Sequence, residues 1–78
     1  MPVVMRIAGY RVVIFPNDHK PPHVHVIGPD GQAIVSLEKP ARLLRVEGIS
    51  HREGSKLAKA VEEHAEALSK EWEAIHGQ

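Results

Sequence analysis

The residue types most able to do chemistry are gathered in one short segment, residues 17–26, which reads N-D-H-K-P-P-H-V-H-V. It contains one carboxylate and three of the six histidines: Asp18, His19, His23 and His25. Imidazole binds borderline divalent ions such as Zn²⁺ and transfers protons near neutral pH, and a carboxylate supports both kinds of chemistry. These four residues are therefore the candidate functional site.

Two of the four are predicted to point the same way. His23 and His25 are separated by one residue, and alternate side chains of a strand project from the same face of a sheet. Val24 and Val26 then face the core on the opposite side. The preceding loop is stiffened by two consecutive prolines and is expected to bring the other two candidates towards the histidine pair.

This cluster supports different chemistries. In one, Asp18, His19, His23 and His25 are ligands for Zn²⁺ or another divalent metal ion. In another, no metal is needed: His23 and His25 act as general base and general acid in the cleavage of an RNA phosphodiester, and the other two position them. A third interpretation is that these residues only shape the loop and the strand. The sequence leaves all three open.

Positive charge is concentrated in the same half of the chain. Residues 1–46 hold six Lys or Arg and three acidic residues, a net charge of +3, whereas residues 47–78 hold four basic and seven acidic residues. An anionic ligand is therefore expected to meet the first half. Arg6, Arg11 and Lys20 are the candidate phosphate-binding residues there.

The composition sets limits on the class of protein. Seventy-eight residues suffice for one domain, which is expected to span residues 1–78. The absence of cysteine excludes disulfides, thiolate nucleophiles and cysteine-containing zinc sites. No apolar run approaches the roughly 20 residues that span a bilayer, and ten basic residues balance ten acidic ones. We expect a cytoplasmic protein without membrane contact and without the strongly basic field of a general nucleic-acid binder.

Residues 1–47 are predicted to form a small antiparallel sheet of three to four strands. The first two strands flank Ala8-Gly9, a hairpin signal, and a two-residue turn would place Arg6 directly opposite Arg11. Strands are predicted at four places, and a fifth segment is left open as a short edge strand or a connection: residues 3–7, 10–15, 23–27 and 32–37, and then 43–46.

Residues 50–76 are predicted to form one long helix that covers this sheet, so the fold class is α+β. Ser50 and Glu53 fit the S-x-x-E capping box, Gly54 weakens the first turn, and Gly77 suits the helix end. Apolar residues recur at helical spacing and form one stripe: Ala58, Val61, Ala65, Leu68, Trp72 and Ile75.

The apolar residues at the far end of this helix must be buried against another surface. From His51 to His76 the helix would extend about 39 Å, against about 20 Å for strands of five or six residues. Either the helix breaks, or the turns that bear Leu68, Trp72 and Ile75 dock against a second copy of the chain. We expect the second case, a homo-oligomer formed through this helix. The three histidines of the helix are not assigned to the site.

The chain resembles a known family, the small bacterial proteins grouped as domain of unknown function 4160. The resemblance covers nearly the whole chain and lies in Arg6, Gly9-Tyr10-Arg11-Val12, Asp18-His19, Pro21-Pro22-His23-Val24-His25-Val26 and Glu71-Trp72. It departs at the helix start, where a Leu-Pro pair is common and this chain has Gly48-Ile49-Ser50-His51. The resemblance implies a component of a two-gene module similar to toxin–antitoxin pairs, with a cognate antitoxin-like protein and an RNA-directed activity.

The leading prediction for function is therefore a toxin-like component that acts on RNA through the histidine cluster. The alternative is a non-enzymatic module that binds metal or a protein partner and has a regulatory role. An enzyme would depend on His23 and His25, whereas an interaction module would depend on Leu68 and Trp72.

Overall fold

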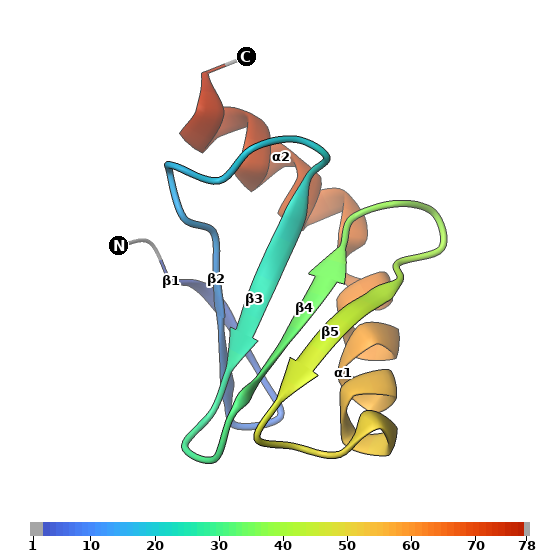
Figure 1. The fold of residues 1–78 in the computed structure, drawn as a ribbon. Coiled ribbons are helices and arrows are strands. Elements are labelled where there is room, and N and C mark those ends of the chain that lie inside the picture. The colour runs from blue at the N-terminus through green and yellow to red at the C-terminus, as the bar shows by residue number, and fades with distance from the viewer. Residues whose placement is uncertain (1–2, 78) are drawn as a thin grey trace.

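The protein folds into a five-stranded sheet followed by two helices (Figure 1). The computed structural model describes residues 3–77. Along the chain the elements are β1 (Val3–Ile7), β2 (Tyr10–Val13), β3 (His23–Ile27), β4 (Gln32–Ser36), β5 (Leu43–Glu47), α1 (His51–Glu63) and α2 (Ala65–His76). The predicted α+β class is confirmed. In the described part of the chain, no helix is long and apolar enough to cross a membrane.

The strands form one antiparallel sheet in which each strand pairs with its neighbours in the sequence, in the order β1-β2-β3-β4-β5. The predicted number of three to four strands is thus corrected to five. The segment that had been left open is the edge strand β5, whose Val46 pairs with Ala33 of β4. β5 is stabilised at the edge of the sheet because Leu43 and Val46 pack against α1 at Gly54.

The β1–β2 hairpin has the predicted register. Ile7 pairs with Tyr10, and Arg6 pairs with Arg11. The two residues of the Ala8-Gly9 turn have φ angles of 51° and 83°, as a type I′ hairpin turn requires. The two arginines consequently stand opposite each other on neighbouring strands.

One face of the sheet carries the core. Its completely buried side chains come from three central strands and are Val12, Val24, Val26, Ala33 and Val35. The helices cover this face, with α1 packed behind β4 and β5 (Figure 1). The predicted inward orientation of Val24 and Val26 is confirmed. Because strand side chains alternate, His23 and His25 lie on the other face.

The prediction of one long helix is wrong. α1 ends at Glu63, His64 leaves the helical conformation with φ −116° and ψ 16°, and α2 begins at Ala65. The thirteen residues of α1 span about 20 Å, a length that matches the strands it covers. After the break, α2 passes behind the end of the sheet at which β3 begins (Figure 1).

This break allows the chain to cover its own far end. Leu68 and Trp72 are only 0% and 2% exposed, and Ile75 is half-buried. The residues that were expected to face a second copy therefore pack against the chain's own core. The uncovered helix end was the reason to expect a homo-oligomer, and that reason does not hold. Self-association itself stays a prediction.

The first turn of α1 is held close to the sheet. Ser50 Oγ accepts from the backbone N–H of Glu53 at 3.0 Å, which is one half of the predicted capping box. The Glu53 carboxylate accepts instead from the Tyr10 hydroxyl at 3.3 Å. Gly54 faces β5 so closely that an added Cβ would clash with Cγ1 of Val46. The glycine that weakens this turn is thus what permits the helix to approach the sheet.

Replacing Gly54 with alanine should destabilise the protein, although alanine is better than glycine in a helix by about 1 kcal/mol. The added methyl group has no room beside the β-branched side chain of Val46. Because overpacking costs about 1–3 kcal/mol, urea unfolding should show a net loss of up to about 2 kcal/mol. Ser55→Ala, at the exposed neighbouring position, is the matched control. Equal or higher stability of Gly54→Ala would contradict the packing described.

Candidate metal centre

The loop between β2 and β3 brings Asp18 to the sheet face that carries His23 and His25. The backbone N–H of Asp18 donates to the Phe15 carbonyl at 3.0 Å and closes a turn. The loop then passes through two consecutive prolines, whose rings fix φ near −65° immediately before β3. The structure therefore brings together the carboxylate and the two strand histidines that sequence reasoning had selected.

Three side-chain atoms converge at this point. Oδ2 of Asp18 lies 3.1 Å from Nε2 of His23 and also 3.1 Å from Nε2 of His25. All three ligand atoms lie within 4.8 Å of one another. The side chains are 26%, 17% and 16% exposed, respectively, so water reaches them only in part. We call these three residues the Asp-His-His cluster.

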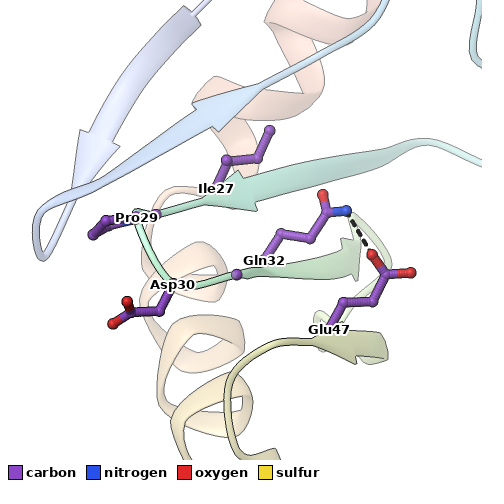
Figure 2. A pocket seen from close by; sticks show the side chains of 7 residues that line it. Ile27, Pro29, Asp30, Gln32 and Glu47 are labelled. Atoms are coloured by element: carbon purple, nitrogen blue, oxygen red, sulfur yellow. Dashed lines mark hydrogen bonds between the residues drawn. The ribbon is translucent and has the colours of Figure 1, made fainter.

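The other nitrogen of each ring faces an acceptor. Nδ1 of His23 lies 2.9 Å from the carbonyl oxygen of Pro21, and Nδ1 of His25 lies 3.5 Å from Oε1 of Gln32. Gln32 donates from Nε2 to Oε1 of Glu47 at 3.0 Å (Figure 2), which orients its amide oxygen towards the imidazole. Because carbonyl oxygens only accept, these contacts favour a proton on Nδ1 of each ring.

This proton placement brings acceptors together. A neutral imidazole protonated on Nδ1 has a lone pair on Nε2, and the carboxylate oxygen of Asp18 carries negative charge. The contacts of 3.1 Å between Asp18 Oδ2 and the two Nε2 atoms are therefore attractive where Nε2 also carries a proton, as in the hydrogen bond between His25 and Asp18, or where a metal cation lies between the atoms. The Asp-His-His cluster is therefore suited to hold a positive charge.

Aromatic rings flank the cluster. Phe15 meets His25 edge to face with ring centroids 4.7 Å apart. Trp72 lies with its centroid 5.4 Å from that of His23, which it reaches because α2 passes the end of the sheet. Such apolar neighbours lower the local dielectric constant and so strengthen the attraction between the cluster and a cation.

His76 is the residue that sequence reasoning missed. It is half-buried and stacks on Trp72 with centroids 3.7 Å apart and an interplanar angle of 21°. Its Nε2 lies 3.1 Å from the backbone oxygen of Asp18. No local signal predicts this contact, because 58 positions separate the two residues. The spacing of four from Trp72 indicates only a shared helix face.

The structure does not bring His19 into the cluster. Its side chain is exposed, and the group of three converging ligand atoms does not include it. Lys20, the next residue, lines a pocket of about 630 Å³ together with Trp72 and His76. A second pocket of about 340 Å³ lies at the turn between β3 and β4 and is shown in Figure 2; it adjoins the cluster through Gln32.

Arg6 and Arg11 lie on the same sheet face as the cluster. Arg11 pairs with Ile27, and Val13 pairs with His25, so Arg11 is a diagonal neighbour of His25, at about 7–8 Å in such a sheet. Among residues 3–77, neither arginine forms a salt bridge. The two arginines are thus near the cluster without being part of it.

The nitrogen contacts predict the tautomers of His23 and His25. In metal-free protein, long-range ¹H–¹⁵N spectra should show that His23 and His25 carry a proton on Nδ1, either alone or together with one on Nε2, because Nδ1 faces an oxygen acceptor. The exposed His51 is the internal control and should show the Nε2–H tautomer that predominates in free histidine. Neutral His23 or His25 protonated only on Nε2 would contradict this geometry.

Comparison with known families matches residues 9–73 to the family described as Domain of unknown function (DUF4160). The matched segment includes the whole Asp-His-His cluster and Trp72, and it ends before His76. Neither the curated proteins nor the solved structures contain a significant match. Because the family match covers most of the chain, the protein belongs to the DUF4160 family.

Proposed function

We propose that this protein binds one divalent transition-metal ion, with Zn²⁺ as the first choice, through Oδ2 of Asp18 and Nε2 of His23 and His25. The observation that supports this is the convergence of three potential ligand atoms within 4.8 Å of one another, while Nδ1 of each ring faces an oxygen acceptor. A cation among the three atoms would be attracted by the carboxylate and by the lone pairs on Nε2. Three protein ligands leave a fourth position for water or substrate, which is the arrangement of catalytic rather than structural zinc sites.

The two distances to the carboxylate oxygen are close to those of a zinc site. Ligand bonds of about 2.0–2.1 Å at tetrahedral angles place neighbouring ligand atoms about 3.4 Å apart. The two observed separations from the carboxylate oxygen are 3.1 Å, so each would change by a few tenths of an ångström, and the two imidazole nitrogens lie within 4.8 Å of each other. The Nδ1 contacts of His23 and His25 supply the outer hydrogen bonds that usually orient metal-binding imidazoles.

Calorimetric titration of chelator-treated protein should give one Zn²⁺ per chain. Asp18→Asn, His23→Ala and His25→Ala should each lower the affinity by more than about tenfold, because each removes a ligand. His19→Ala is the matched control and should bind as the wild type does, since His19 lies outside the cluster. Wild-type protein that does not bind Zn²⁺, or variants that bind it equally well, would exclude this site.

A second proposal concerns RNA, and the position of Arg6 and Arg11 supports it. Like charges directly across two strands cost stability, and no carboxylate of residues 3–77 compensates these guanidinium groups with a salt bridge. A phosphate would bind both and would lie next to His25 on the same face. In this proposal His23 and His25 act on an RNA phosphodiester, and the protein is a toxin-like component with an antitoxin-like partner.

Measuring the binding of a labelled RNA tests this proposal directly. Arg6→Gln and Arg11→Gln should each weaken binding and lower the salt dependence of the affinity by about one counterion. The control is Arg52→Gln, an exposed arginine on α1, which should bind normally. Cleavage assays with chelator and with added Zn²⁺ then separate acid–base from metal-dependent chemistry. RNA cleavage that persists in His23→Ala and His25→Ala would remove the catalytic assignment.

A further inference from the structure

We propose that His76 is a positioning residue for the metal ligand Asp18, and that metal occupancy is thereby coupled to the docking of the last turn of α2. This inference rests on the proposed metal site and adds a residue to it from the other end of the chain. His76 does not touch the ion. It acts on the backbone of a ligand, through the hydrogen bond between its Nε2 and the Asp18 carbonyl oxygen.

The backbone of Asp18 is held from both sides. Its N–H donates to the Phe15 carbonyl at 3.0 Å, and its carbonyl oxygen faces Nε2 of His76 at 3.1 Å. These two contacts set where the Cα–Cβ bond points, and therefore where the carboxylate lies relative to the two strand histidines. Without the second contact the turn would still close, but its carboxylate would lose one of the two restraints on its direction.

His76 is itself held in place. Its ring stacks on Trp72 at 3.7 Å, and its Nδ1 lies 3.0 Å from the carbonyl oxygen of the same residue. A neutral imidazole donates from only one of its two nitrogens, so the stacking is the contact that holds the ring while Nε2 donates to Asp18. Trp72 is 2% exposed and also lies against the ring of His23, with centroids 5.4 Å apart. One buried tryptophan thus supports both the residue that orients Asp18 and a second ligand of the proposed site. This arrangement is what an outer shell of a metal site requires.

Coupling follows from this geometry. If a docked α2 end raises the affinity of the cluster for metal by some factor, bound metal must favour the docked end by the same factor. A helix end that only packed against the core would not need a donor aimed at a carbonyl 58 residues away. Loss of such a packing contact would lower the stability of the protein without a specific effect on the imidazoles of His23 and His25.

Three substitutions separate the hydrogen bond from the stacking. His76→Gln keeps an N–H donor near the position of Nε2, His76→Phe keeps an aromatic ring on Trp72 without a donor, and His76→Ala removes both. For Zn²⁺ affinity we expect a 10–100-fold loss in the Phe and Ala variants, as for other outer-shell partners, and a much smaller loss in the Gln variant. His51→Phe and His51→Gln at the exposed start of α1 are the matched controls and should bind as the wild type does.

A metal-free measurement keeps this inference separate from the metal proposal. In chelator, the imidazole ¹⁵N signals of His23 and His25 should shift in His76→Phe and stay near their wild-type positions in His76→Gln. If wild-type protein does not bind Zn²⁺, the metal proposal fails and these signals alone decide whether His76 positions Asp18. Unchanged signals in His76→Phe, or equal Zn²⁺ affinity in His76→Phe and His76→Gln, would overturn the positioning role.

Discussion

The structure around the candidate site depends on one constraint: the Asp18 carboxylate oxygen lies 3.1 Å from Nε2 of both His23 and His25. Nδ1 of each ring already faces an oxygen, the carbonyl of Pro21 or the amide of Gln32. A proton on Nε2, as in the hydrogen bond between His25 and Asp18, or a bound cation is therefore required between these partly buried atoms.

The break after Glu63 has an effect on this site as well as on the fold. A continuous helix would carry Trp72 and His76 beyond the end of the sheet, into solvent or onto a second chain. With the break, α2 passes the beginning of β3 (Figure 1). Trp72 then closes the core and contacts His23, and His76 reaches the Asp18 loop. One change of direction therefore makes the site a joint product of the first strands and the last helix.

The two proposed functions use different parts of the same sheet face. Metal binding relies on the Asp-His-His cluster, where the geometry is specific and the polar atoms are shielded. RNA binding relies on Arg6 and Arg11, whose charges are uncompensated but solvent-accessible to different degrees. The two are compatible, since a phosphodiester held by the arginines would lie beside His25 and beside a metal with an open fourth position.

The local patterns of this sequence were sufficient for a large part of the result. Alternation along β3 determined that Val24 and Val26 are buried and that His23 and His25 share the opposite face. The Ala8-Gly9 turn determined the register of Arg6 and Arg11, because a two-residue turn allows only one pairing. The short proline-stiffened loop was also expected to bring Asp18 towards the two histidines, and Asp18 lies beside them. In all these cases the relevant contacts are within a few residues or one strand pairing.

Other features depended on contacts between distant segments, and only the tertiary structure decided them. His19 is also a possible ligand and lies next to Asp18 in the same loop, yet it is exposed, because the loop turns only Asp18 towards β3. The break at His64 involves neither proline nor glycine; burial of Leu68 and Trp72 against the sheet end accompanies it. His76 has no sequence signal because its partner lies 58 positions away. Periodicity determines which face of an element is apolar, but packing decides where that element turns and which distant residue it meets.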